Sequence, residues 1–348
     1  MAVQVGIVGA SGYGGAELVR LLSAHPEFDV AVVAAHGQAG TPVADLYPNL
    51  VDFGSFDGVN VDALADLDLV FLATPHGPAA ELGSALFDAN VRTIDLSAAF
   101  RLDADRFSQW YGEEHSRPDL LATDDSVHGA AVYGITEFAR SAVASATLVA
   151  NPGCYVITAL LGLVPVASLF EPASLVVDGK SGTSGAGRAA KDALHFSHVD
   201  SNLTAYGAPG HRHTGELERY LGHLGDYHQP VTFIPHLVPM ARGLLITATA
   251  TLRDDIDGDA VQQALVDAYR DAPFVHVLEP GRFPSTKAVA GSNGCQVSAV
   301  VDPRTQRVIV TSVTDNLGKG AAGGAVQNAN VLFGLPETTG LTAIGIYP

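Results

Sequence analysis

The sequence predicts an α/β protein in which a parallel-sheet domain is joined to an α+β domain with a mostly antiparallel sheet. Three observations predict this. The chain opens on an apolar strand, residues 3–8, followed at once by a glycine-rich turn and a helical pattern. Further short core strands recur at 29–35, 68–73 and 92–96. Later segments, 231–234, 244–252, 296–301 and 307–313, alternate in polarity as paired antiparallel strands do.

Length and composition indicate a globular protein of a reducing compartment. The 348 residues are enough for two cores, and 47% of them are hydrophobic. Cys154 and Cys295, the two cysteines, lie far apart, which argues against a disulfide framework. The first residues enter a strand directly and no apolar run reaches 18 residues, so neither a signal peptide nor a membrane span is expected. We therefore expect a cytoplasmic protein.

The charge excludes several kinds of partner. The formal net charge is −18, and the chain contains four lysines. Such a surface argues against binding to nucleic acids or to anionic membranes. A lysine-poor, strongly anionic chain is also typical of salt-accumulating organisms, and we hypothesise that origin. The alternative is an ordinary acidic cytosolic protein.

The first glycine-rich turn has the spacing of a dinucleotide-binding loop. Gly9 would make the tight turn, Gly12 would let the backbone approach a pyrophosphate, and Gly15 would pack helix against strand. The pyrophosphate would then lie at the helix N-terminus. A glycine-rich turn without a ligand is the alternative. The candidate cofactor residues here are Gly9, Ser11, Gly12, Tyr13, Gly14 and Gly15.

The ends of two further strands add cofactor candidates. His36 follows the second strand, where an NAD-preferring site would place a carboxylate for the ribose hydroxyls. Nothing there would repel a 2′-phosphate, so NADP is favoured. Thr74 and Pro75 follow the third strand and should face the ligand crevice, whereas His76 is expected in solvent. Arg101, after the strand 92–96, is a candidate phosphate fork.

Cys154 lies where a strand gives way to a helix. Asn151-Pro-Gly separates the apolar run 146–150 from a fifteen-residue run, 156–170, that predicts a buried helix. The helix N-terminus would stabilise a thiolate, the nucleophile that covalent chemistry at a carbonyl needs. A buried, inert cysteine is the alternative. Cys295 falls within strand patterning, so we assign it to packing.

Two later clusters complete the candidate site. Residues 179–188 combine glycines and hydroxyls between Lys180 and Arg188, a composition able to hold an anion by backbone N–H groups. His211 and His213 lie two residues apart in GHRHTGE. Zinc is the alternative use of these histidines, but their spacing matches no standard zinc site, so no metal is expected. A histidine paired with the thiolate and oriented by Glu216 is the favoured use.

The motifs together resemble the N-acetyl-γ-glutamyl-phosphate reductase family. The segments that carry the resemblance are GASGYGG, FLATPHG, IDLSAAFR, ANPGCY, SGTSGAGR, GHRHTGE and DNLGKGAAGGAVQN. The resemblance implies an NADP-binding Rossmann domain, residues 1–150 and 316–348, interrupted by a catalytic and oligomerisation domain, residues 151–315. It implies reduction of an acyl phosphate to a semialdehyde in arginine biosynthesis, by a homo-oligomer, dimer or tetramer.

The resemblance and the residue chemistry together assign roles. Cys154 would be the nucleophile and His211 the acid–base group, with His213 as its rival. The candidate substrate-binding residues are Arg101, Asn151, Ser181, Arg188, His213 and Glu216, and Gly182 and Asn316 join the cofactor set.

Two alternatives remain open. The stretch Tyr-Gly-Ala-Pro-Gly before HRHTGE departs from the family's usual HRHTPE pattern. It looks more like relatives whose glutamate or 2-aminoadipate is linked to an acidic amino-group carrier protein, for arginine or lysine synthesis. Arg212 and Arg219 would then contact the carrier. A catalytically inactive NADP-binding sensor on the same fold is the more remote alternative.

Overall fold

The computed structural model describes residues 2–121 and 130–347, and the chain forms two compact units. Unit 1 comprises Met1–Gly153 and Ala321–Leu341, and unit 2 comprises Cys154–Gly320 and Thr342–Pro348. The C-terminal residues from Thr342 on had been expected in the nucleotide-binding domain. They belong to unit 2 instead, because Asn293 N–H donates to the Thr342 carbonyl and Ile346 N–H to the Ala290 carbonyl, both at 2.8 Å.

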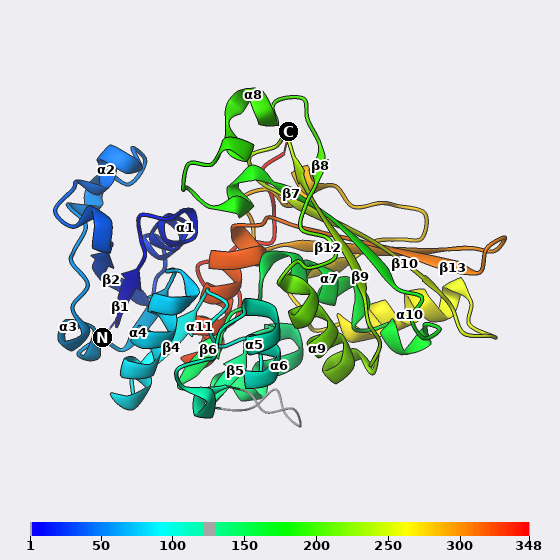
Figure 1. The fold of residues 1–348 in the computed structure, drawn as a ribbon, viewed down its shortest axis with the longest axis horizontal. Helices are drawn as coiled ribbons and strands as arrows, with labels where there is room; N and C mark the ends of the chain where they lie inside the picture. Colours follow the sequence, from blue (N-terminus) through cyan, green and yellow to red (C-terminus); the bar gives the residue numbers. More distant parts are fainter. Residues whose placement is uncertain (1, 122–129, 348) are drawn as a thin grey trace. The chain divides into compact units, whose positions relative to one another are not determined.

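Unit 1 is built on a six-stranded sheet in the order β2-β1-β3-β4-β6-β5, with every pair parallel (Figure 1). Its strands are β1 (Val3–Val8), β2 (Phe28–Ala34), β3 (Leu69–Leu72), β4 (Arg92–Asp95), β5 (Ala131–Tyr133) and β6 (Leu148–Ala150). The chain runs from β1 to β2 on one side and returns to β3 on the other side of β1. Ligands of open α/β sheets bind beyond the carboxyl ends of strands at such a reversal.

Helices cover both faces of this sheet because successive strand residues point to opposite sides. Ile7 and Phe71 pack in one core with α1 and α11, while Val8 and Leu72 pack in another with α3 and α4. The helices of unit 1 are α1 (Tyr13–Leu22), α2 (Val43–Leu46), α3 (Val61–Ala65), α4 (His76–Asp88), α5 (Ala104–Tyr111), α6 (Thr136–Ala144) and α11 (Gly323–Leu332). The doubly covered parallel sheet confirms the predicted fold class.

The polar, acidic composition of residues 103–125 predicts a surface excursion. Its first part forms α5, capped by the Asp103 carboxylate, and Phe107 of this helix is buried. Residues 122–125 of the segment lie outside the described residues.

Unit 2 is built on a seven-stranded sheet in the order β11-β12-β13-β10-β7-β9-β8. Four of its neighbouring pairs are antiparallel, and two, β11 with β12 and β7 with β9, are parallel. The strands are β7 (Val176–Gly182), β8 (Thr204–Ala205), β9 (Thr232–Val238), β10 (Leu244–Thr251), β11 (Val275–Val277), β12 (Cys295–Asp302) and β13 (Arg307–Thr314). A mostly antiparallel second sheet is confirmed.

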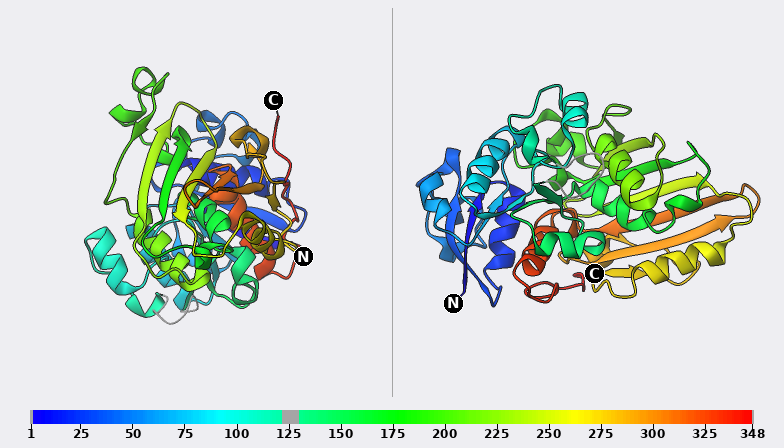
Figure 2. Two further views of the ribbon diagram at one scale, coloured as in Figure 1. Left: turned by 90° about the vertical axis from the view of Figure 1, so that its right-hand side faces the viewer. Right: turned by 90° about the horizontal axis from the view of Figure 1, so that it is seen from below.

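Three helices lie on one side of this sheet: α7 (Cys154–Leu163), α9 (His213–Gly225) and α10 (Gly258–Ala268) (Figure 1). The predicted helix over 156–170 starts two residues earlier and ends at Leu163, because Pro165 cannot continue it. A segment containing α8 (Phe196–Val199) projects away from the strands (Figure 2). Among the described residues, no helix is long and apolar enough to cross a membrane.

Candidate active site

The glycine loop of unit 1 has the geometry that a pyrophosphate cradle needs. Gly9 has φ +88°, and a Cβ there would lie 2.5 Å from the Ala73 carbonyl oxygen. A Cβ on Gly15 would lie 2.4 Å from the Gly9 carbonyl oxygen. Helix α1 then begins at Tyr13 with Gly12 as N-cap, no side-chain cap and no acidic residue in its first turn. The first backbone N–H groups of α1 therefore face an anion site unopposed by carboxylate charge.

The neighbouring strand end contributes an unsatisfied polar atom. The Thr74 hydroxyl is buried and has no hydrogen-bond partner among the described residues. Thr74 N would lie 3.0 Å from a Cβ on Gly9, so Thr74 borders the glycine loop. A buried hydroxyl without a hydrogen-bond partner, at the carboxyl end of a parallel strand, is available to bind a cofactor. His36 follows β2 in a single 3-10 turn without an acidic residue. These residues fit a dinucleotide.

Cys154 is the first residue of α7 and is half-buried. The Thr158 hydroxyl donates to the Cys154 carbonyl oxygen at 2.8 Å, which closes the first helical turn. The π-helical segment Gly318–Ala322 passes close by, because a Cβ on Gly320 would lie 3.0 Å from the Cys154 Cβ. The predicted location at a helix N-terminus is thus correct, and a thiolate is favoured there.

Two tyrosines that sequence reasoning missed line the same site. The Tyr206 hydroxyl donates to the Tyr155 hydroxyl at 3.4 Å, and Tyr155 donates to the His236 carbonyl oxygen at 2.8 Å. Burial raises the pKa of Tyr155, and Tyr206 and the charge of Cys154 raise it further. The pKa of Tyr206 is raised by desolvation and by the same cysteine. Both hydroxyls therefore remain protonated donors close to Cys154 at neutral pH.

The histidines of the HRH segment pack around Tyr155. The ring centroids of His211 and His213 lie 6.0 Å and 5.9 Å from that of Tyr155, and 4.9 Å from each other. The backbone N–H of His213 donates to His211 Nδ1 at 3.2 Å. In the neutral ring, this bond leaves the proton on Nε2. Burial, followed by the charge of Arg212, lowers the pKa of His211 to about 4.

His211 is therefore a neutral hydrogen-bond donor through Nε2 at physiological pH. This tautomer suits stabilisation of an oxyanion better than removal of a proton from the thiol. Glu216, predicted to orient a histidine, is buried on the first turn of α9, the helix that His213 begins. Thr214 followed by Glu216 and Glu218 is also a helix-start pattern, and α9 begins one residue earlier, at His213.

Comparison with known proteins places the chain in a family. Residues 4–146 match the family described as semialdehyde dehydrogenase, NAD binding domain, and residues 154–316 match semialdehyde dehydrogenase, dimerisation domain. The chain is 45% identical to the N-acetyl-gamma-glutamyl-phosphate reductase of Symbiobacterium thermophilum, with all of both chains covered. It is 46% identical to the enzyme of that name from Alkalilimnicola ehrlichii, over 99% of this chain and all of the relative. The chain belongs to the N-acetyl-gamma-glutamyl-phosphate reductase family.

Solved structures agree on the fold. Aspartate semialdehyde dehydrogenase II from Vibrio cholerae, in complex with ASA, aligns with a TM-score of 0.71 at 17% identity, covering 96% of this chain and 98% of its own. The aspartate semialdehyde dehydrogenase with NADP from Candida albicans aligns with a TM-score of 0.65 at 14% identity, covering 96% of this chain and 99% of its own. The reductase family thus shares its two-unit architecture with these dehydrogenases.

Within this family fold, the second glycine-rich segment differs from its prediction. Residues up to Gly182 are part of β7, and the segment then makes one 3-10 turn, Thr183–Ala186. The backbone N–H groups of Gly182, Thr183 and Ser184 donate to carbonyls of residues 240–243. These groups are therefore unavailable to an anion. Ser181 is buried, and its hydroxyl donates to the Gly182 carbonyl oxygen at 3.1 Å.

The loop that pairs with this segment is fixed by a buried carboxylate. Asp315 has no exposed surface; Arg242 donates to it from Nε at 2.9 Å and from Nη2 at 3.0 Å. Asp315 also accepts backbone N–H groups from Gly291, Leu317 and Gly318. Asn316, predicted to bind cofactor, joins the two loops: its Oδ1 accepts from Gly243 N–H and its Nδ2 donates to the Ser184 hydroxyl, both at 2.8 Å.

The predicted arginines have different surroundings. Arg101 is 6% exposed and donates to the carbonyl oxygens of Asn151 and Leu96, at 2.8 Å and 2.7 Å. Arg188 lies on the exposed segment after the 3-10 turn. Arg212 is exposed, but Arg219 is 8% exposed and lies over the Tyr220 ring. The burial of Arg219 argues against the carrier-protein contact predicted for it.

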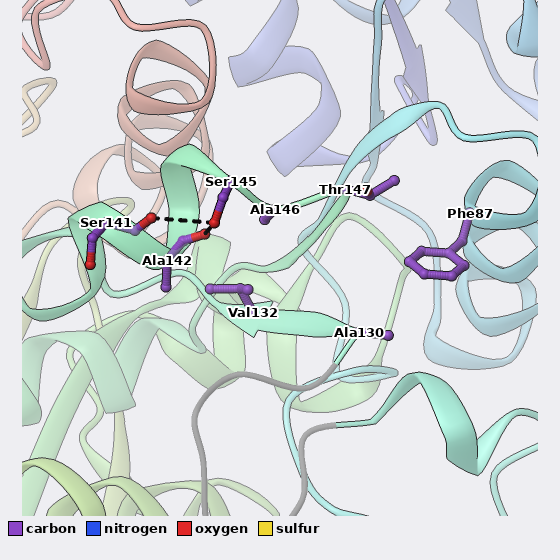
Figure 3. Close-up of a pocket in the computed structure, with 8 residues that line it drawn as sticks. All are labelled: Phe87, Ala130, Val132, Ser141, Ala142, Ser145, Ala146 and Thr147. Carbon is purple, nitrogen blue, oxygen red and sulfur yellow. Dashed lines mark hydrogen bonds between the residues drawn. The ribbon is translucent and has the colours of Figure 1, made fainter.

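A cavity of about 410 Å³ lies elsewhere in unit 1, beside β5, β6 and α6 (Figure 3). Its lining residues are Phe87, Ala130, Val132, Ser141, Ala142, Ser145, Ala146 and Thr147. The Ser145 hydroxyl donates to the carbonyls of Ser141 and Ala142 at 3.4 Å and 3.2 Å, as helix-end serines commonly do. None of the predicted site residues lines this cavity.

Proposed function

We propose that the chain is an NADPH-dependent reductase of N-acetyl-γ-glutamyl phosphate that forms the semialdehyde, releases phosphate and serves arginine biosynthesis. The observation that carries the proposal is the position of Cys154 at the start of α7, where its charge acts on the hydroxyls of Tyr155 and Tyr206, with the His211 ring packed against both tyrosine rings. A nucleophile at a helix N-terminus, next to hydrogen-bond donors for a developing oxyanion, is the arrangement that acyl transfer requires. The full-length similarity to enzymes of that name supports the choice of substrate.

In the first step, the Cys154 thiolate attacks the acyl carbon of the substrate. The C–S bond forms, the bond from carbon to the phosphate oxygen breaks, and phosphate leaves with the electron pair. The positive end of the α7 dipole stabilises the thiolate before attack. His211 Nε2–H is available to hydrogen-bond the carbonyl oxygen as negative charge develops on it.

The second step reduces the thioester on Cys154. The Gly9–Gly15 turn and Thr74 would hold NADPH, which would supply the hydride. His211 stabilises the resulting oxyanion, which collapses to the aldehyde as the C–S bond breaks and Cys154 leaves as a thiolate. Formation of the thioester divides a difficult reduction into two accessible steps.

The preference for NADPH rests on the end of β2. His36 and the 3-10 turn that it begins offer no carboxylate to the adenosine ribose. This turn therefore contributes no carboxylate that would repel a 2′-phosphate and no acidic partner for the ribose hydroxyls of NADH. We expect the specificity constant for NADPH to be well above that for NADH. The variant His36→Asp should lower the ratio of the NADPH constant to the NADH constant.

Replacement of the nucleophile tests the proposal. Cys154→Ser should abolish turnover of N-acetylglutamate semialdehyde, phosphate and NADP in the reverse direction, with NADPH binding unchanged. Cys295→Ser is the matched control, because Cys295 is buried in β12 and should be dispensable. Retention of a few per cent of the wild-type rate in Cys154→Ser would reject the covalent route. Failure of the wild type to turn over the acetyl compound would reject the substrate.

We also propose a cytoplasmic homo-oligomer formed through unit 2, whose residues match a dimerisation domain. In the segment that contains α8, the side chains of Phe196 and Leu203 are 78% and 57% exposed. A second copy of the chain would cover this apolar surface. Sedimentation of wild type and Phe196→Asp tests this. A wild-type monomer at micromolar concentration would contradict the proposal.

A further inference from the structure

Every polar group of Asn151, which lies three residues before Cys154, is paired inside unit 1. Its backbone N–H donates to the Asp95 carbonyl oxygen, and its own carbonyl accepts from Arg101 Nε, both at 2.8 Å. Its side-chain Nδ2 donates to the Ala321 carbonyl oxygen at 3.3 Å, and its Oδ1 accepts from Asn328 Nδ2 at 3.2 Å. Asn151 is 1% exposed. These bonds argue against the substrate contact predicted for it.

Asn328 reaches Asn151 from helix α11 and has no exposed surface. Its Nδ2 also donates to the Gly134 carbonyl oxygen at 2.7 Å, and its Oδ1 accepts from the Thr136 hydroxyl at 2.7 Å. Position 134 requires glycine, because a Cβ there would lie 2.5 Å from Asn328 Nδ2. Both amide hydrogens and the oxygen of Asn328 are therefore used. These hydrogen bonds fix the orientation of the Asn328 amide group and of the Asn151 amide group.

Arg101 holds the same residue from the opposite side. Its Nε and Nη2 donate to carbonyls of Asn151 and Leu96, two residues that follow neighbouring parallel strands, β6 and β4. The guanidinium fork thus ties together two strand ends at the edge where Cys154 follows. Two of its donors are used by the backbone, which favours a structural contact over the phosphate clamp predicted for this arginine.

We propose that Asn328 and Arg101 are positioning residues that fix the Asn151–Gly153 turn and thereby the placement of the Cys154 sulfur. This inference rests on the proposed function, in which Cys154 is the nucleophile. Neither residue needs to touch the substrate. A misplacement of about 1 Å at a reacting atom can lower the rate by about 100-fold, so a loosened turn should lower kcat strongly.

Helix α11 offers a matched control two residues further on. Asn330 also has no exposed surface and also makes three hydrogen bonds, from Nδ2 to the carbonyls of Glu337 and Thr339 and between Oδ1 and His25. These bonds hold the C-terminal part of unit 1 and do not involve Asn151. Asn328→Leu and Asn330→Leu should therefore lose similar amounts of stability, because each leaves three buried polar groups unpaired.

Asn328→Leu and Asn330→Leu should differ in the reactivity of the Cys154 sulfur. We expect Asn328→Leu to lower kcat at least about 10-fold, with the Michaelis constants and the NADPH dissociation constant within about twofold of wild type. We expect it to slow alkylation of Cys154 by iodoacetamide several-fold at pH 7, because a displaced thiolate loses the helix N-terminus. Asn330→Leu should leave both rates within about twofold. Alkylation is measured without substrate, with Cys154→Ser as the blank, so it tests the positioning even if the proposed reaction is wrong.

Milder variants keep the test valid if Asn328→Leu does not fold. Thr136→Val removes one hydrogen bond to Asn328 and should slow alkylation, whereas Thr136→Ser keeps the hydroxyl and should restore the wild-type rate. Arg101→Lys should lower kcat with the Michaelis constant for phosphate unchanged in the reverse direction. Equal alkylation rates in the Asn328 and Asn330 variants would overturn the proposal. A raised Michaelis constant for phosphate with unchanged kcat in Arg101→Lys would overturn the role of Arg101.

Discussion

Two glycine-rich segments, residues 9–15 and 179–188, have similar compositions but different roles in the structure. Residues 9–15 leave β1, turn sharply at Gly9 and present the first N–H groups of the ten-residue helix α1. Residues 179–188 end a strand, and the N–H groups at 182–184 donate to the loop 240–243. In the first segment, Gly9, Ala10 and Gly12 donate to backbone carbonyls, but the segment leads into the N-terminus of α1, which has no side-chain cap. In the second segment, the N–H groups at 182–184 are used on the facing loop. Composition alone does not distinguish an anion site from a packed crossing of two loops.

The glycines of the second segment serve close packing. A Cβ on Gly179 would lie 2.6 Å from the Tyr155 ring, and one on Gly182 would lie 2.9 Å from the Met240 carbonyl oxygen. Gly179 therefore lets the Tyr155 ring, which also contacts the His211 ring, pack closely against β7. The second segment contributes to the site by shaping its wall, without binding an anion through its backbone.

The largest expected effect is in the first segment. Gly9→Ala forces a side chain onto a backbone with φ +88° and against the Ala73 carbonyl oxygen, so the loop must move. We expect the NADPH dissociation constant, measured by fluorescence titration, to rise by about 100-fold. Gly58→Ala is the control, because a Cβ there meets nothing within 4 Å. Unchanged affinity in Gly9→Ala would remove this loop from the cofactor site.

Gly182→Ala should act on stability instead. The added Cβ meets backbone oxygens of Met240 and Ala241 at 2.9 Å and 3.0 Å, and we expect a loss of about 2 kcal/mol in the free energy of unfolding by urea. NADPH affinity should stay within about twofold of wild type. The opposite pattern, weaker binding at full stability, would restore the interpretation of this segment as an anion loop.

His211, which packs against Tyr155, should make the free energy of unfolding depend on pH. His211 has a pKa of about 4 in the folded state, below the value near 6.5 of an unfolded chain. Stability from the neutral ring is therefore present above pH 6.5 and is lost as the pH falls towards 4. We expect His211→Asn to lose less unfolding free energy than wild type between pH 7 and pH 4.5. An equal loss in both proteins would show that His211 does not titrate in this window.

Arg188 should show the smallest effect. It closes the second segment on an exposed stretch, away from the packed residues 182–184. We expect Arg188→Ala to change the Michaelis constant for phosphate in the reverse direction by less than about twofold. A tenfold increase would return this arginine to the phosphate site.

The sequence was informative where structure depends on neighbours along the chain. The Gly9 turn, the start of α7 at Cys154 and the start of α9 at His213 follow from local spacing, and all three lie where expected. Contacts across long separations were not accessible. Arg101 pairs with Asn151, 50 residues away, and the N–H of Gly182 pairs with Gly243, so neither arrangement can be read from local composition.

Tyr155 and Tyr206 were missed for a similar reason. Tyr155 directly follows Cys154, and this adjacency to the candidate nucleophile was the one available signal. Tyr206 belongs to an exposed segment with no periodicity. Its hydroxyl meets Tyr155 because the segment pairs with β9, where Tyr206 N–H donates to the Pro235 carbonyl oxygen at 3.0 Å.

A burst experiment tests the central claim, the thioester on Cys154, most directly. N-acetylglutamate semialdehyde and NADP are mixed with the enzyme in the absence of phosphate, and NADPH is followed by absorbance. Attack of Cys154 on the aldehyde and one oxidation should give about one NADPH per active site and then stop, until added phosphate releases the acyl group and restores turnover. Absence of a burst in the wild type, or a burst of equal amplitude in Cys154→Ser, would contradict the account.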